Sequence, residues 1–190
     1  MVQIDKEKIY SVEEYEYVNF ISLSITEKIE VLSWRNNPVI RKWMKNTELI
    51  DEESHLKFVD NLKERQDIFY WVVRKNGKAI GCYNIIHIDN INKACESGIY
   101  FIDTTLSGLK MSYEMIINSF IFTFQVLGFK RMYAHTHEDN DFMLKLNEYA
   151  GYKRIGKDSQ NFLELSLGNA DFERNYKEGM DFRKFISQFR

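Results

Sequence analysis

Residues 111–127 limit the possible folds most strongly, because they are apolar on nearly every face of the helix that they predict. A helix of this kind has to be buried, and a sheet is the partner we expect for it. The overlapping run 115–129 is interrupted by Asn118, Ser119, Thr123 and Gln125. It therefore falls short of the roughly 18 consecutive apolar residues that a membrane-spanning helix needs.

The segments around this helix carry a regular succession of strand and helix patterns. Strands are predicted at residues 15–23, 68–74, 79–88, 94–102, 131–136, 152–155 and 162–167. Helices are predicted at residues 26–32, 39–44, from 51 onward, 111–127, 141–150 and in the C-terminal tail. Strand–helix–strand units occur only in the second half, so the order predicts a mixed α+β fold.

Length and charge exclude several classes of protein. The chain has 190 residues, 26 Lys and Arg against 28 Asp and Glu, and a net charge of −2. This predicts one domain, with a core at residues 15–167 and an amphipathic helix at residues 178–190, and no strong field to attract nucleic acid or a membrane. Cys82 and Cys95 cannot form a disulfide framework. Because no apolar leader opens the chain, we expect a soluble, cytoplasmic protein.

Residues 99–111 are the most informative segment, because a strand ends there, a loop containing Ser107 and Gly108 follows, and the long helix begins. The first turn of a helix has unpaired N–H groups and a partial positive charge. Glycine lets the backbone approach a phosphate closely, and Lys110 adds a full charge. The segment is either a pyrophosphate cradle or an ordinary helix start with Ser107 as its cap, and the loop alone does not decide between them.

A second segment, residues 135–140, leaves a strand and opens a helix at Asn140. An Asn in this position caps the helix or bonds a ligand's amide linker. His135 and His137 are two residues apart on the strand, so they point to one face. We expect structural or cavity-lining roles for them, since a third metal ligand is not evident and no metal is predicted.

Together the two segments give the order strand, phosphate-type turn, buried helix, strand, Asn, short helix, Gly-Tyr, strand. This order resembles the Gcn5-related N-acetyltransferase (GNAT) family over about residues 15–167. The resemblance implies a mostly antiparallel, twisted sheet of about seven strands, splayed in a V between the fourth and fifth, with helices on both faces. It implies acetyl-CoA as co-substrate, held by Ile99, Tyr100, Phe101, Ile102, Ser107, Gly108, Leu109, Lys110, Met111, Asn140 and Asn147.

Two segments depart from the family's pattern. In the pyrophosphate loop the central glycine, Gly108, matches, but both ends of the motif differ. Seven residues after Asn140 the family carries a Tyr that protonates the departing thiolate, and here the residue is Asn147. A thiolate is a tolerable leaving group without an acid, so we expect activity to be reduced rather than abolished.

The N-terminal half indicates which class of acceptor the enzyme uses. Residues 31–44, with His55 and residues 70–73, resemble a branch that contains the nucleotide-sugar 4-amino N-acetyltransferases of the pseudaminic acid pathway. This likeness implies a UDP-linked 4-amino-4,6-dideoxy sugar, bound by Arg35, Met44 and His55. Arg suits a diphosphate and Met an apolar methyl group. Arg35 also fits a helix cap, Met44 a core position, and His55 a satisfied core histidine.

The predicted reaction is direct attack of a neutral amine on the thioester in a ternary complex. The resemblance places Glu96 and Asn140 in the catalytic site, with Glu96 as the leading base, although an exposed strand carboxylate fits the sequence equally well. His87 and Glu138 are weaker candidates near the substrate. A backbone N–H on residues 98–101 is expected to polarise the carbonyl.

Other outcomes stay open at this point. One alternative is a different acceptor, either a polyamine or a protein N-terminus. The other is a CoA-binding module with weakened catalysis, and Asn147 is the best argument for it. The tail carries Phe182, Phe185, Ile186 and Phe189 at helical spacing. These side chains fit either the chain's own core or a homodimer.

Overall fold

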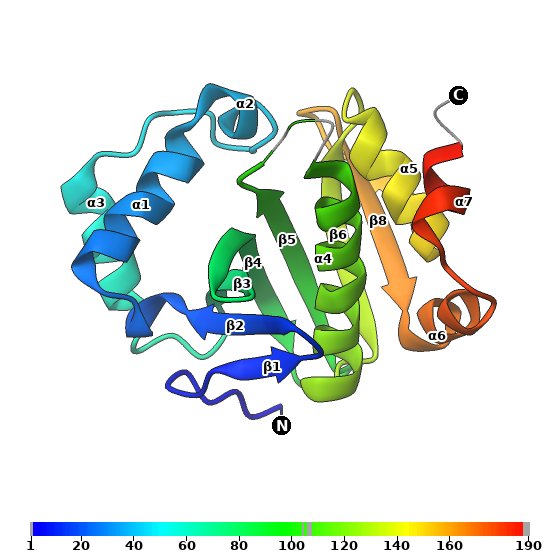
Figure 1. Ribbon diagram of the computed structural model, residues 1–190, viewed down its shortest axis with the longest axis horizontal. Coiled ribbons are helices and arrows are strands. Elements are labelled where there is room, and N and C mark those ends of the chain that lie inside the picture. Colours follow the sequence, from blue (N-terminus) through cyan, green and yellow to red (C-terminus); the bar gives the residue numbers. More distant parts are fainter. Residues whose placement is uncertain (1, 104, 106–107, 188–190) are drawn as a thin grey trace.

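The computed structural model describes residues 2–103, 105 and 108–187. Its centre is one eight-stranded sheet with the order β1-β2-β3-β4-β5-β6-β8-β7 (Figure 1). The strands are β1 (Tyr10–Val12), β2 (Tyr15–Asn19), β3 (Phe69–Lys75), β4 (Lys78–Asp89), β5 (Ala94–Phe101), β6 (Arg131–His137), β7 (Lys153–Lys157) and β8 (Phe162–Gly168). Neighbouring strands are antiparallel except β5 and β6, which are parallel. The mixed, mostly antiparallel fold is therefore confirmed, with one strand more than the seven predicted.

The additional strand, β1, is only three residues long and pairs with β2 through Val12 and Tyr15. The first predicted strand is also shorter than residues 15–23. Asn19 ends it, because its side chain accepts a hydrogen bond from the Ile21 N–H and caps a 3-10 turn, η1 (Phe20–Ser22). Short polar side chains of this kind favour turns over strands.

The β3–β4 hairpin follows directly from the sequence. Asn76 and Gly77 have positive φ angles of 51° and 74°, and Lys75 pairs with Lys78 across the turn. Both residue types tolerate this conformation, which matches the twist of the flanking strands.

Helices α1 (Ile25–Asn36), α2 (Pro38–Arg41) and α3 (Glu52–Asn61) come from the N-terminal half. Ser24 and Glu27 form a capping box at the start of α1, and Pro38 opens α2. Helices α1 and α3 pack on one face of the sheet, where Val31 and Val59 meet Val72 and Cys82. In Figure 1 they form the left side of the molecule.

The opposite face carries α4 (Leu109–Ile121) and a π-helical continuation, η3 (Phe122–Val126), in place of one uninterrupted helix. The buried polar residues of this run attach it to the sheet. Asn118 accepts a hydrogen bond from the Tyr17 hydroxyl (2.9 Å) and donates to the Val12 carbonyl (3.1 Å), and Thr123 bonds Tyr83 (2.6 Å). Within the described ranges, no helix combines the length and the hydropathy that crossing a bilayer demands.

Three helices complete this face: α5 (Asp141–Ala150), α6 (Asn169–Lys177) and α7 (Phe182–Ile186). Within the described part of residues 178–190, the predicted C-terminal helix is α7, which contains Phe182, Phe185 and Ile186, and Phe189 lies outside the described residues. Helix α6, which precedes it, was not predicted. Phe185 is fully buried against Tyr113, Phe142 and Tyr149 of the same chain. In the described part of the tail, Phe185 is therefore covered by the chain's own core.

Candidate active site

The main opening in the sheet lies between β5 and β6. These strands pair only through Ala94–Glu96 and residues 131–133. Beyond that point β5 keeps its pairing with β4 up to Phe101, and β6 keeps its pairing with β8 up to His137. The two strands therefore part in a V, at the place predicted for the fourth and fifth strands of the original seven.

The edge of β5 that faces this V carries free backbone groups. The Lys93 carbonyl accepts a hydrogen bond from the Lys130 N–H on the β6 side. The Ile102 N–H, in contrast, donates a hydrogen bond to the Ile80 carbonyl on the β4 side. Backbone groups alternate in direction along a strand, so the N–H groups of Ile99 and Phe101 point toward β6. No β6 residue pairs with them, so these donors are free to bind an extended ligand or a polarised carbonyl.

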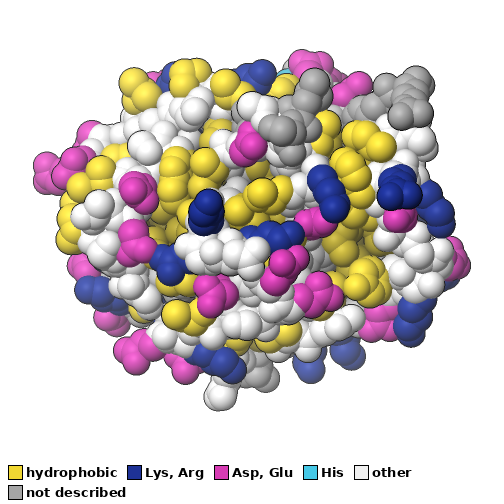
Figure 2. Space-filling model, in the orientation of Figure 1, with side chains coloured by type: hydrophobic (Ala, Val, Ile, Leu, Met, Phe, Trp, Pro, Cys, Tyr) yellow, Lys and Arg dark blue, Asp and Glu magenta, His cyan; other side chains and the backbone are white. Residues whose placement is uncertain are grey.

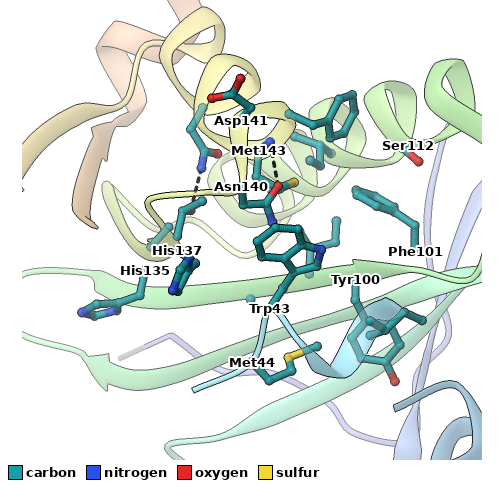
Figure 3. A pocket seen from close by; sticks show the side chains of 18 of the residues that line it. Trp43, Met44, Tyr100, Phe101, Ser112, His135, His137, Asn140, Asp141 and Met143 are labelled. Atoms are coloured by element: carbon teal, nitrogen blue, oxygen red, sulfur yellow. Dashed lines mark hydrogen bonds between the residues drawn. The ribbon is translucent and has the colours of Figure 1, made fainter. Parts of the chain in front are cut away.

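A cavity of about 480 Å³ fills the V. Its size is in the range of small-molecule and cofactor sites. Tyr100 and Phe101 line it from β5, His135 and His137 from β6, and Trp43 from the segment after α2 (Figure 3). Figure 2 shows hydrophobic side chains in the middle of the corresponding face, between the α1 side and α4.

The N-terminus of α4 lies at one end of this cavity, where Leu109 and Ser112 line it. Gly108 is the N-cap residue, and no described side chain caps the helix there. A Cβ on Gly108 would lie 2.7 Å from the Asp103 carbonyl oxygen and 2.9 Å from its side-chain Cγ. Any larger residue at this position would therefore force Asp103 or the loop to shift, and the glycine leaves first-turn N–H groups available to an anion.

Asn140 and Asn147 lie on α5 and also line the cavity. Asn140 is the N-cap, with its Oδ1 accepting from the Met143 N–H at 3.3 Å. The buried Asn147 donates through Nδ2 to the Thr136 hydroxyl at 3.1 Å. The structure therefore brings both to the cavity, and the amide of Asn147 is held against β6.

Tyr152 is a hydroxyl-bearing residue of the cavity that the sequence reasoning missed. Its hydroxyl lies 3.4 Å from the Ser97 Oγ at the point where the strands part. Burial raises the pKa of Tyr152 well above its ordinary value, so the phenol stays protonated. Its place directly after Gly151, the C-cap of α5, fixes its position but carries no obvious functional signal.

Glu96 does not line the cavity but lies one side chain behind it. Its Oε1 is 2.9 Å from Nδ1 of His135, and its Oε2 is 2.9 Å from Nδ1 of His87. His135 lines the main cavity, whereas the side chain of His87 is 74% exposed and lines a separate, smaller pocket. A bulge in β4, with His87 at a φ of 51°, turns that ring toward Glu96.

Of the three candidate acceptor-binding residues in the N-terminal half, only one lines the cavity. Met44 lines the cavity, next to Trp43. Arg35 is half-buried beside Tyr100, and its Nη2 donates to the Asn46 carbonyl at 2.6 Å. Its buried Nη1 has no hydrogen-bond partner within the described part of the chain. His55 is buried against α1, with Nε2 2.9 Å from the Lys28 carbonyl, and it is not among the cavity's lining residues.

The remaining predicted residues lie around the rim or away from the cavity. Lys110 pairs with Glu114 at 3.6 Å, Met111 is partly exposed, and the Ile102 N–H bonds the Ile80 carbonyl. Glu138 forms an ion pair with Lys157 at 2.7 Å. Ser107 lies outside the described residues.

The described residues provide neither a nucleophilic thiol nor a metal site. Both thiols are free and buried, and burial raises the pKa of Cys82 to about 12, so neither is placed as a nucleophile. Among residues 2–103, 105 and 108–187, no three His, Cys, Asp or Glu side chains cluster as a metal site would require.

Comparison with known proteins gives a family match and close relatives. The family model "Acetyltransferase (GNAT) domain" matches residues 21–153. The acetyltransferase PseH of Campylobacter jejuni subsp. jejuni serotype O:2 is 33% identical over 129 residues, which are 67% of this chain and 78% of that protein.

Solved structures share the fold. The Campylobacter jejuni N-acetyltransferase PseH in complex with acetyl coenzyme A superposes with a TM-score of 0.62 and 22% identity, over 82% of this chain and 99% of the other. The spermidine N-acetyltransferase of Vibrio cholerae, in complex with CoA and spermine, gives a TM-score of 0.72 and 14% identity, over 85% of this chain and 99% of the other.

Proposed function

The chain belongs to the GNAT acetyltransferase family and is an acetyl-CoA-dependent N-acetyltransferase, and from this premise we propose that its acceptor is a UDP-linked 4-amino-4,6-dideoxy sugar. The observation that carries the proposal is the 33% identity to the acetyltransferase PseH over 129 residues. The apolar wall that Trp43 and Met44 add to the cavity supports it, because a 6-deoxy sugar presents a methyl group.

The residues present fit the co-substrate. The first-turn N–H groups of α4, which begins after the N-cap Gly108, can bind the diphosphate of acetyl-CoA. The pantetheine arm is an extended amide chain, and the free N–H groups of Ile99 and Phe101 face the V in which we place it. Asn140 and Asn147 border the same cavity from α5.

In this arrangement the thioester carbonyl accepts a hydrogen bond from one of the free β5 N–H groups. The acceptor's neutral nitrogen attacks the carbonyl carbon, the C–N bond forms, and the C–S bond breaks with its electron pair passing to sulfur. Since the thiols of Cys82 and Cys95 are buried, transfer is direct and forms no acyl-enzyme. The free, buried thiols also support our placement of the enzyme in a reducing compartment, the cytoplasm.

Arg35 is our candidate for the nucleotide part of the acceptor. Its Nη1 has no partner in the described part of the chain, and the guanidinium lies near Tyr100, a residue of the cavity wall. A guanidinium binds diphosphate or carbonyl oxygens with paired donors. If this is its role, Arg35→Gln raises KM for the UDP-sugar about tenfold and leaves KM for acetyl-CoA unchanged, by loss of a charge-assisted hydrogen bond.

A polyamine is the second candidate acceptor. The observation in its favour is the presence of Asp103, Asp139 and Asp141 among the lining residues, since carboxylates bind ammonium groups. Hydrogen bonds from Thr105 lower the pKa of Asp103 and keep it ionised. A polyamine lacks the methyl group and the diphosphate that Met44 and Arg35 would recognise.

Acetyl transfer with defined acceptors tests the proposal. CoA release is followed with a thiol reagent, and the product's mass is checked for one added acetyl group. We expect turnover with the UDP-4-amino-4,6-dideoxy sugar, none with the matching 4-hydroxy sugar, and little with spermidine. Turnover with spermidine but not with the amino sugar would replace the first candidate by the second.

A further inference from the structure

We propose that His135, rather than Glu96, is the base that takes the acceptor's proton, and that Glu96 acts through it as a positioning residue. This inference rests on the proposed acetyl transfer. It starts from one arrangement: the Glu96 carboxylate lies between two imidazoles, and of these three side chains His135 alone lines the main cavity.

The contact between Glu96 and His135 sets the imidazole's tautomer. A carboxylate only accepts hydrogen bonds, so at 2.9 Å the Nδ1 atom of neutral His135 carries the proton and donates it to Oε1 of Glu96. The other ring nitrogen, Nε2, then keeps its lone pair. A carboxylate that fixes a histidine in this way makes it a proton acceptor and stabilises the imidazolium that forms.

The second histidine of the strand is arranged in the opposite sense. The Asp139 N–H donates to Nδ1 of His137 at 3.3 Å, so in the neutral ring Nε2 carries the proton. The His137 ring also packs against Phe162 and Trp43, with ring centroids 5.2 and 6.1 Å away. It is therefore a wall of the cavity and has no lone pair free on Nε2. Figure 3 shows both rings extending from β6.

The charged groups around His135 suit a ring that becomes cationic. Glu96 contacts it from β5, and Glu164 of β8 lies 3.9 Å from Nε2. His87 reaches the cluster from β4 through the other oxygen of Glu96. Glu164 is partly exposed, so it offers the proton a way to solvent once Nε2 has taken it from the amine. The transfer balances: the amine loses one proton to Nε2 as its nitrogen bonds the acetyl carbon and the thiolate leaves.

The first test is chemical rescue. With the amino sugar as acceptor, His135→Ala should lower kcat about 10²–10⁴-fold, the range for a lost general base, with KM for acetyl-CoA within twofold of wild type. Added imidazole should restore part of that loss, which it would not do for a purely structural residue. Glu96→Gln should lower kcat about tenfold, and the matched exchange Glu173→Gln in α6 should leave it unchanged.

A second measurement needs no acceptor, so it separates this inference from the identity of the substrate. In ¹⁵N-labelled protein at pH 8, NMR should find His135 with the proton on Nδ1, and Glu96→Gln should change that signal. Three results would each overturn the assignment of His135 as the base. The first is a kcat of His135→Ala equal to that of the active wild type, and the second is a reduced kcat of His135→Ala that imidazole does not restore. The third is an NMR spectrum with the His135 proton on Nε2. Failure of the wild type to acetylate the sugar, with the expected NMR result, would overturn the acceptor alone.

Discussion

Asn147 lies on α5, and by the family resemblance described above it stands where a thiolate-protonating Tyr is expected. Its side chain is buried, borders the cavity and bonds Thr136. An amide has no proton to give at neutral pH, so the departing thiolate lacks an acid from this position.

Restoring that acid is the first prediction. Because the position borders open volume, Asn147→Tyr should raise kcat about tenfold or more, part of the 10²–10⁴ that a general acid supplies. Asn147→Phe is the matched control, since it adds the same ring without the hydroxyl and should give no gain. If both exchanges leave kcat at the wild-type value, the proton comes from elsewhere, and the buried phenol of Tyr152 is the next residue to change.

At the scale of elements, the polar side chains of α4 join the helix to the sheet. Asn118 satisfies both the Tyr17 hydroxyl and the Val12 carbonyl in a buried layer. We predict that Asn118→Leu lowers the free energy of unfolding by about 1–3 kcal/mol, because the Val12 carbonyl loses its side-chain donor and the Tyr17 hydroxyl keeps only Ser119 as a partner. Urea unfolding measures the loss. Gln125→Leu, on the exposed side of the same run, should change stability by less than about 0.5 kcal/mol.

The start of α4 gives a prediction about the co-substrate. Gly108→Ala places a methyl group against Asp103, and this should displace the first-turn N–H groups and raise KM for acetyl-CoA about tenfold, the equivalent of one lost charge-assisted hydrogen bond. Gly168→Ala is the control, because a Cβ there meets only ordinary contacts at 3.7 and 4.0 Å. Equal KM values for acetyl-CoA in the two variants would show that the diphosphate does not bind at this helix end.

The elements that the sequence predicted well have strong local signals. The 3.6-residue pattern of α5, the Asn76–Gly77 turn and the alternation along β6 each specify one structure. The elements that the sequence did not predict have weak local signals. Strand β1 has three residues, and α6 buries only Phe172, so neither repeats its pattern often enough to be recognised.

The site was less predictable, because it depends on how elements meet. That His135 and His137 share a face follows from their spacing. That Glu96 contacts His87 depends on a bulge in β4, and that His55 faces the Lys28 carbonyl depends on how α3 packs on α1. Neither register nor helix packing can be read from these residues alone.

At the scale of the molecule, a charged cluster joins three parts of the fold near one sheet edge. Lys75 of β3 contacts Glu114 of α4 at 2.8 Å and the Tyr15 hydroxyl of β2 at 3.1 Å. Burial opposes ionisation of Glu114, but hydrogen bonds from Lys75 and Tyr15 outweigh it and lower the pKa of the carboxyl. The ionised form is thus favoured by folding.

The pH dependence of stability follows from that sign. A carboxyl whose pKa is lower in the folded state stabilises the protein above its unfolded pKa, and the contribution is lost as pH falls through the folded value. Glu114→Gln should therefore lower the free energy of unfolding by about 1–2 kcal/mol at pH 7, the worth of hydrogen bonds to a charged group. The difference from wild type should shrink below about pH 4.5. A difference that does not change with pH would assign the effect to packing instead.

We place the pantetheine arm of acetyl-CoA in the V between β5 and β6, with its diphosphate at the first turn of α4. A crystal structure with the bound coenzyme tests this most directly. We predict an extended arm bonded to the N–H groups of Ile99 and Phe101, with the diphosphate on the amides that follow Gly108. Coenzyme bound elsewhere, or β5 and β6 paired along their whole length, would show that the V is not the coenzyme site.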